Sequence, residues 1–393
     1  MEYVRNFKNE IQVLNLELKK RMSDTQAVDI EEVSPERVIN VGASIGQWFR
    51  GLSGNRVLVY SFRRILTIIP LFIGISIITF ALMYMIGDPL AYLIQQNPQI
   101  RPEDIDRLRE AMGLSQPPTQ QYLIWLVGFA RFDLGLTFFS REPVLTEIGK
   151  YLTETLKLQS TQFLISLIIS IVLGVLAAKF QNTWIDSGVS SLALLGLSMP
   201  IFVFGNLLIF IFAGRGLDWF PAGKAHSTNV LPTDWSALWS GNIGTFFRSF
   251  TTYMGDTIWY MILPVATLVF ASLALFTRLV RGSMLEILRQ DYILSARANG
   301  LSERAVLISH GLRNALLPVV TFIGLFIGAV LAGAPITETV FSYPGLGAKF
   351  VEYIGRLDHP LIMGISMIIT LMILVANLLT DIAYVWVDPR IEI

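Results

Sequence analysis

The chain has 393 residues, with 30 basic residues, 30 acidic residues and no cysteine. Charged residues make up only 15% of it, against about 25% in soluble domains, which excludes a fully soluble protein. The balanced charge argues against a nucleic-acid-binding protein, and the absence of cysteine excludes disulfide scaffolds, iron–sulfur clusters and thiolate zinc sites. The histidines, His226, His310 and His359, are too scattered to indicate another metal site.

The N-terminal extension, residues 1–56, is polar and lacks the apolar core of a signal peptide, so we expect no cleavable signal. Its first part has apolar residues at the spacing of one helix face, which predicts an amphipathic helix over about 3–21. This face contains Val4, Phe7, Ile11, Leu14 and Leu18. Two interpretations stay open: a helix that docks on the membrane surface, or one that covers a partner or folds loosely.

Six runs without Asp, Glu, Lys or Arg follow the extension, and each reaches the roughly 20 residues that a helix needs to cross a bilayer. We therefore predict six transmembrane helices. They cover about 65–87, 158–178, 187–214, 257–277, 314–337 and 359–380. A seventh uncharged run, 111–130, is interrupted by Pro117-Pro118, and its apolar part, 122–130, is too short to span.

Six spans place both termini on one side of the membrane. Basic residues exceed acidic residues in the segments on that side, and acidic residues exceed basic ones on the other, so the N- and C-termini are predicted to be cytoplasmic. The large segment 88–157 and the aromatic-rich segment 215–256 are then external, and the inner segment, 278–313, is cytoplasmic. Within 88–157, Pro102 and the acidic pair after it predict a helix over 102–112.

The predicted spans lack the residues that drive transport by themselves. No ionisable side chain lies in the middle of a span, where proton relays and voltage sensors need one. No nucleotide-binding motif is present either, because the stretch 222–225 lacks the first glycine of a P-loop and has alanine after Lys224. We therefore expect a non-catalytic chain without a cofactor or metal of its own, which takes its energy from a partner.

Small residues recur at two places that are suited to helix contacts. In the inner segment, Ala296 and Gly300 are four residues apart, so on one helix they would lie above each other and leave a groove. Gly300 is also suited to end that helix, and Ser302 to begin the next. An ordinary amphipathic loop is the alternative for this segment.

The fifth predicted span has a second set of small residues at four-residue spacing, after Pro318 near its start: Gly324, Gly328 and Ala332. Such residues permit close helix contact in membranes. They would pack against a partner subunit or line a solute pathway, or they would pack within the chain, and both interpretations stay open.

Several motifs carry a resemblance to a known family. The stretch DYILSARANGLSERAVLISHGLRNALLPVVT (291–321) resembles the coupling segment of ABC-transporter permeases of the dipeptide, oligopeptide and nickel type. MIGDP (85–89), GLSMPIFVFGNLL (196–208), WFPAG (219–223) and ETVFSYPGLG (338–347) are similar to other motifs of that family and follow in the same order. The resemblance covers about 57–393, and it leaves out the extension. Leu294-Ser295-Ala296 stand where many ABC permeases have Glu-Ala-Ala.

The resemblance implies an all-α membrane protein, with a six-helix permease domain (57–393) of the type I ABC importer fold. It implies that residues 291–318, called the coupling segment below, contain a coupling helix that contacts an ATPase. The matching positions are Tyr292, Ala296, Gly300, Leu301, His310, Arg313 and Asn314.

The implied partners are a second homologous permease subunit, two ATP-binding subunits that hold ATP and Mg²⁺, and an external solute-binding protein in a prokaryotic inner membrane. A peptide-like solute is favoured, and an oligosaccharide or a nickel chelate is the alternative. A secondary transporter, a channel or a membrane scaffold are the competing classes, and the charge-free spans argue against the first two.

Overall fold

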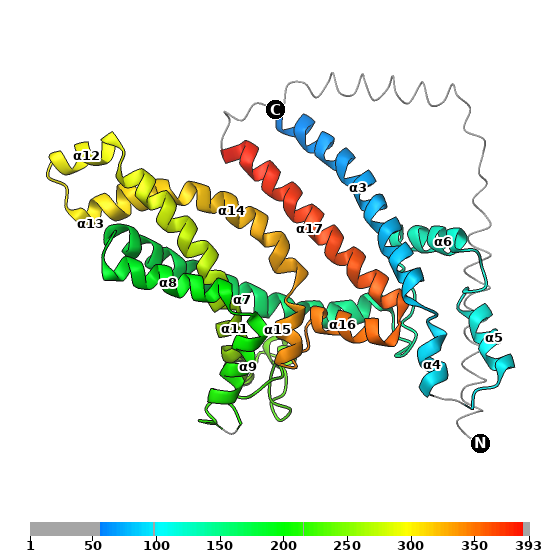
Figure 1. Ribbon diagram of the computed structural model, residues 1–393. Helices are drawn as coiled ribbons and strands as arrows, with labels where there is room; N and C mark the ends of the chain where they lie inside the picture. Colours follow the sequence, from blue (N-terminus) through cyan, green and yellow to red (C-terminus); the bar gives the residue numbers. More distant parts are fainter. Residues whose placement is uncertain (1–55, 97–98, 215, 388–393) are drawn as a thin grey trace, which may run out of the picture. The chain divides into compact units, whose positions relative to one another are not determined.

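The structure is a computed structural model that describes residues 56–96, 99–214 and 216–387. In this part of the chain it is helical, with one isolated β-bridge between Leu136 and Pro143 and no strand (Figure 1). The chain divides into two compact units: residues 1–145, 354–367 and 381–393 belong to the first, and residues 146–353 and 368–380 to the second. The amphipathic helix predicted over 3–21 lies outside the described residues.

Long apolar helices form the membrane part of the protein. Among the described residues, five helical stretches are long and apolar enough to cross a bilayer. They coincide with or overlap α3 (Arg56–Ile86), α7 (Val144–Lys179), α11 (Ile243–Leu288), α14 (Arg313–Ala332) and α17 (His359–Val387). The exposed Leu, Ile and Phe side chains on these helices suit contact with lipid.

The third predicted span is bent. The helices α8 (Trp184–Ser198) and α9 (Ile201–Phe212) pass the same test only as a pair, with an angle of 104° between them. Pro200 has no N–H group to continue the helical hydrogen bonds, and it holds the preceding Met199 in an extended conformation, with φ −86° and ψ 123°. The run predicted as one span over 187–214 therefore turns sharply in its middle.

In the first unit, a short apolar helix packs along α3. The unit also contains α4 (Leu90–Gln96) and α5 (Pro102–Ala111), which confirms the helix predicted over 102–112. The helix α6 (Pro118–Ala130) includes the run 122–130 that is too short to span. Its Tyr122 hydroxyl lies 2.8 Å from the hydroxyl of Ser76 in the middle of α3, and the ring of Phe129 lies against that of Phe72 in a tilted arrangement, with centroids 5.2 Å apart. The short helix thus covers a polar group inside the first span.

Asp358 holds the loop between α6 and α7 against the start of α17. One carboxylate oxygen accepts the backbone N–H of Leu361 at 3.3 Å, which caps the helix, and the other accepts the N–H of Phe138 at 2.9 Å. The side chain is fully buried. This burial raises the pKa of Asp358 to about 6, although the N–H donors act in the opposite direction.

This raised pKa predicts a pH dependence of stability. Because the folded protein holds the Asp358 proton more tightly than the unfolded chain, the residue contributes most stability below pH 3.8 and loses that contribution as the pH rises to about 6. The shift corresponds to roughly 3 kcal/mol. Melting curves of the purified protein and of Asp358→Asn between pH 4 and 7 measure it. The stability of the wild type relative to the variant should fall over this range, and a constant difference would contradict the assignment.

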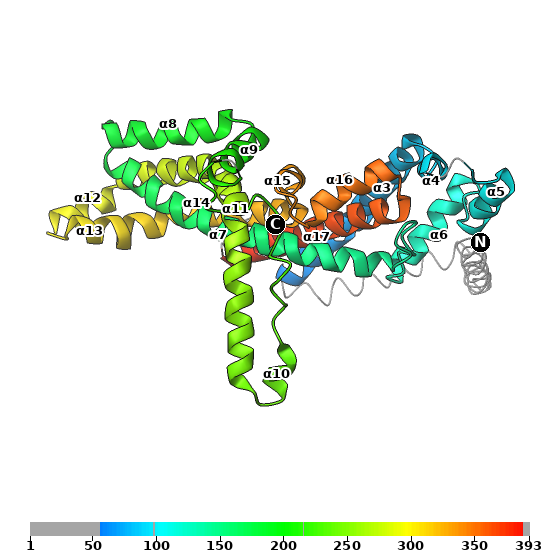
Figure 2. The same cartoon turned by 90° about the horizontal axis from the view of Figure 1, so that it is seen from below.

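The second unit is built around α11. At 46 residues, this helix contacts α8, α9 and α14, and its middle part contributes Met261, Leu263 and Val265 to an apolar core cluster. Its first turns extend beyond the other helices of the unit, where the short helix α10 (Trp235–Trp239) lies beside them (Figure 2). The last turns of α11 pack on α14 through Val280 and Met284. One helix therefore joins the segment that contains α10 to the segment 278–313.

A buried carboxylate organises the segment after α14. Glu338, in α15 (Pro335–Val340), is fully buried and accepts hydrogen bonds from the Thr155 hydroxyl at 2.9 Å and from the N–H groups of Ala348 at 2.8 Å and Ala334 at 3.4 Å. A Cβ at Gly345 would lie 2.3 Å from its carboxyl carbon, so a larger residue there would displace the carboxylate from its donors. The loop then continues into α16 (Leu346–Arg356).

Candidate coupling site

The inner segment leaves α11 and returns to α14 through short helices. After α11 ends at Leu288, α12 (Asp291–Ala298) and α13 (Glu303–Ala305) follow, and a π-helix, η1 (Val306–Leu312), leads into α14. Figure 1 shows α12 and α13 together at one end of α14, opposite α15. Wide π-turns are rare and often mark functional sites. The break between the two short helices agrees with the expected positions of Gly300 and Ser302.

Gly300 forms the turn between α12 and α13. Its φ is +78°, a conformation that other residues rarely adopt, and a Cβ placed there would meet nothing within 4 Å. The hydroxyl of Ser302 accepts the N–H of Ala305 at 3.4 Å and caps α13. The predicted groove of stacked small residues is wrong, because α12 ends at Ala298 and Gly300 lies beyond it.

Ala296 faces the interior of the inner segment. It is 8% exposed and packs with Ile293 and Val306, which are fully buried, against the last residues of α11. A larger side chain at this position would push α12 away from α11. Ala296 therefore acts on the geometry of the helix from inside and is not part of its outer surface.

A polar contact joins the two ends of the coupling segment. The side-chain amide of Asn314 donates to the Tyr292 hydroxyl at 3.1 Å and to the backbone carbonyl of His310 at 2.9 Å. The structure thus brings together three of the residues that the sequence singled out, from α12, η1 and α14. Arg313 lies beside them and is exposed.

Apolar side chains are exposed at this end of the second unit. Tyr292 and Leu301, which the sequence indicated, are 42% and 43% exposed, and Leu294 and Ile308 are more exposed still. Leu294, in α12, and Ile308, in η1, were missed, since only the folded segment shows which of its apolar side chains are exposed. Tyr292, Leu294 and Leu301 lie outside the helical stretches that could cross a membrane, and exposed apolar side chains there suit a protein partner.

A buried ion pair fixes α8 to the last part of α11. The guanidinium of Arg281 donates to both carboxylate oxygens of Asp186, at 2.6 and 2.7 Å, and the N–H of Asn182 donates to the same carboxylate at 3.1 Å. The Asp186 side chain is 8% exposed and that of Arg281 is 28% exposed. A two-point pair of this kind holds two helices at one relative angle.

Replacing only one partner of the Asp186–Arg281 pair should lower the stability of the fold. Asp186→Ala leaves the partly buried Arg281 without its partner, so we expect a loss of about 3 kcal/mol in unfolding free energy. The combined Asp186→Leu, Arg281→Met variant leaves no unpaired charge and should lose less. Melting temperatures of the solubilised protein measure both, with the exposed Arg278→Gln on the same helix as the control. A double variant less stable than Asp186→Ala would contradict the pair's proposed role.

The small residues of α14 contact α17 of the same chain. A Cβ at Gly324 would lie 2.2 Å from Thr380 Cγ2, and the Thr380 hydroxyl donates to the Gly324 carbonyl at 3.1 Å. A Cβ at Gly328 would lie 3.4 Å from Ile373. These contacts favour packing within the chain for the two glycines. Ala332 is half-buried at the end of α14, and Pro318 is exposed within it.

Comparison with protein families shows which family this chain belongs to. Residues 170–393 match the family described as binding-protein-dependent transport system inner membrane component, and residues 57–159 match the N-terminal part of the same kind of protein. The chain belongs to this family of permeases. The match includes the coupling segment, the bent pair α8–α9 and the Glu338 loop, so these features lie in the permease domain and not in an addition to it.

Relatives of the permease are similar along most of their length. It is 38% identical over 335 residues to the oligopeptide transport system permease protein of Bacillus subtilis, covering 85% of this chain and 99% of that protein. It is 40% identical over 347 residues to the dipeptide transport system permease protein of Escherichia coli, covering 86% and 99%. A di/tripeptide transport system permease protein of Pseudomonas aeruginosa is 38% identical, covering 84% and 97%.

The predicted class is therefore confirmed: the protein is an all-α integral inner-membrane permease of the ABC importer type. Members of such systems work with ATP-binding and solute-binding partners. The roles of the individual residues of the coupling segment in contacting an ATP-binding subunit stay predictions.

Proposed function

We propose that this permease forms half of the translocation pathway of an ATP-driven importer for short peptides. The observation that carries the proposal is the similarity of 38–40% to permeases of dipeptide, di/tripeptide and oligopeptide transport systems, over nearly their full length. An oligosaccharide or a nickel chelate is the alternative solute.

The proposed complex contains this chain, a second homologous permease subunit, two ATP-binding subunits and an external solute-binding protein. ATP and Mg²⁺ bind the ATP-binding subunits, and this chain holds no catalytic site. Both termini and the inner segment face the cytoplasm, which is supported by the basic Lys179 and Arg289 at the ends of α7 and α11.

Deleting residues 1–56 and measuring assembly of the complex would show whether the N-terminal extension is needed.

The coupling segment suits the transmission of movement. Only two residues separate α11 from α12, and the Asn314–Tyr292 hydrogen bond ties α12 to the start of α14. A force on the exposed surface of Tyr292, Leu294 and Leu301 would therefore move the inner ends of α11 and α14 together. Rigid-body motion of this kind is the common basis of alternating access.

Reconstituted transport tests the proposal. The purified complex in proteoliposomes, with ATP on the side of the ATP-binding subunits, should take up a labelled dipeptide only when the solute-binding protein is present on the other side. Parallel arms offer a pentapeptide, a maltooligosaccharide and a nickel–histidine chelate. Uptake of the sugar or the chelate without peptide uptake would overturn the peptide assignment, and gradient-driven uptake by this chain alone would overturn the ATP-driven class.

A further inference from the structure

A cavity of about 270 Å³ lies where the inner ends of two spans meet the coupling segment. Its walls come from the end of α7, the end of α11, and the short helices α12, α13 and η1, all within the second unit. The volume is below the roughly 300–1,000 Å³ of pockets that enclose a drug-sized molecule, so the cavity suits part of a larger ligand.

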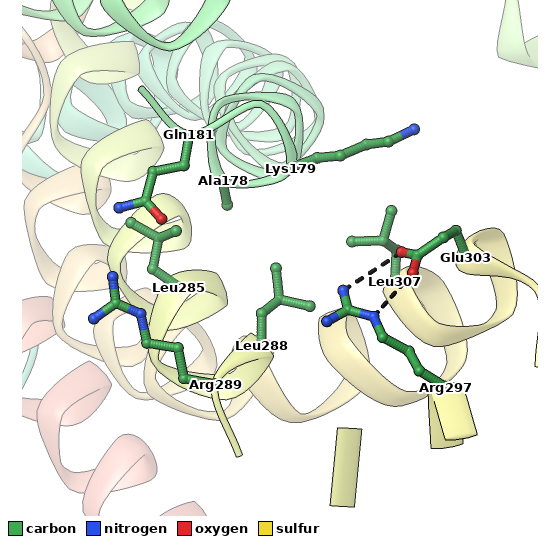
Figure 3. A pocket seen from close by; sticks show the side chains of 9 residues that line it. All are labelled: Ala178, Lys179, Gln181, Leu285, Leu288, Arg289, Arg297, Glu303 and Leu307. Carbon is green, nitrogen blue, oxygen red and sulfur yellow. Dashed lines mark hydrogen bonds and ion pairs between the residues drawn. The ribbon is translucent and has the colours of Figure 1, made fainter. Parts of the chain in front are cut away.

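The cavity has an apolar floor and a polar rim. Figure 3 shows Leu285 and Leu288 between two polar sides, with Gln181 and Arg289 on one side and the Arg297–Glu303 pair on the other. The Lys179 side chain extends from the end of α7 on the side of the ion pair (Figure 3). A ligand here would contact hydrocarbon below and hydrogen-bond donors above.

The rim has an excess of positive charge. Glu303 is the only carboxylate in the wall, and it pairs with Arg297 at 2.9 Å. Among the described residues, no carboxylate forms an ion pair with Lys179 or Arg289, and the Lys179 ammonium lies 5.0 Å from the ring of Phe180. Two positive charges and the Gln181 amide are therefore available to an anion.

The position of the cavity favours a lipid headgroup over a free phosphate or a nucleotide as the bound anion. The apolar span of α7 ends at Lys179, so this side of the cavity lies at the depth where lipid headgroups meet water. Basic cavities between transmembrane helices at this depth commonly bind anionic headgroups. A phospholipid also brings the hydrocarbon that the leucine floor requires, which a free phosphate or a nucleotide does not.

We propose that this cavity binds the phosphate headgroup of an anionic phospholipid, with Arg289 and Gln181 as donors and Lys179 as a second positive charge on the opposite side of the rim. The bound lipid contacts α7, α11 and α13 at once, so it sets how firmly the coupling segment is held against the spans. This inference does not depend on which solute is transported.

Lipid binding to the intact complex tests the proposal. The complex, with its ATP-binding subunits attached, is placed in nanodiscs of phosphatidylcholine with increasing phosphatidylglycerol, and retained lipids are counted by native mass spectrometry. We expect one phosphatidylglycerol per chain. In the combined Lys179→Gln, Arg289→Gln variant, binding should weaken about fivefold for each charge, or about 30-fold in total.

Matched variants separate this site from general surface charge. Arg304→Gln removes an exposed charge from α13 outside the cavity and should leave binding unchanged, and Arg289→Lys should retain most of it. Melting temperatures confirm that the variants are folded. Equal retention of phosphatidylcholine, displacement of the lipid by inorganic phosphate, unchanged binding in the double variant, or loss of the lipid when the ATP-binding subunits are attached would each overturn the proposal.

Discussion

Replacing Gly300 by glutamate should abolish transport while the permease stays folded in the membrane. Within the chain, the substitution costs only the strain of the left-handed backbone, about 1–2 kcal/mol, because φ is +78° and a Cβ meets nothing within 4 Å. The remaining effect must come from a partner that covers this turn. Burying an unpaired charge there costs several kcal/mol, so uptake should fall at least about tenfold.

Two variants separate strain from contact with the partner. Gly300→Asn tolerates the positive φ but adds a side chain, so it should keep the fold and lose part of the coupling. Gly113→Glu repeats the strain in the loop between α5 and α6, where φ is +68° and a Cβ also meets nothing within 4 Å. Peptide uptake, ATP hydrolysis and membrane abundance are measured together. Normal uptake by a membrane-inserted Gly300→Glu protein would show that no ATP-binding subunit contacts the turn.

Replacing Glu338 by alanine should destabilise the fold at least as much as Asp186→Ala does. It leaves the Thr155 hydroxyl and two backbone N–H groups without their buried acceptor, and it opens a cavity beside Gly345. Lost acceptors of this kind cost about 1–3 kcal/mol each, so we expect a loss of roughly 3–5 kcal/mol in unfolding free energy.

Glu338→Gln keeps one acceptor oxygen but turns an amide N–H₂ toward another donor, so its effect should be intermediate. The exposed Asp106→Asn removes one acidic charge without a structural partner and is the control. Melting temperature of the solubilised protein and its abundance in membranes are the measurements. An unchanged melting temperature in Glu338→Ala would mean that the three donors find other acceptors.

The membrane part of the fold was predictable because a bilayer excludes charge, so the charge-free runs had to coincide with apolar helices. The bend at Met199 was not predicted, although the sequence contains Pro200. The composition of the run gives the length of an apolar segment, but it does not give the angle between the helices that form it. The same holds for α6, whose packing on α3 depends on Ser76 and Tyr122, residues distant in sequence. The helix α11 begins at Ile243, earlier than the predicted span, because polar residues can form a helix outside the lipid.

In the coupling segment, the sequence predicted the turn but not the orientation of its residues. Gly300 and Ser302 have local backbone roles that their residue types indicate. Whether Ala296 faces inward and Leu294 outward depends on how α12 is docked on the end of α11, which needs tertiary contacts. The spacing of Gly324 and Gly328 left open whether they pack within the chain or against a partner or pathway. Their contacts with α17 favour packing within the chain.

The length of α11 has a mechanical consequence. At 1.5 Å per residue, its 46 residues make a rod about 69 Å long, with the external α10 near its first turn and α12 two residues beyond its last. Pro264 lies close to the midpoint. A tilt of about 5° around that point displaces each end by about 3 Å in opposite directions. One helix therefore links the segment around α10 to the coupling segment, and a tilt of this helix moves the two segments in opposite directions.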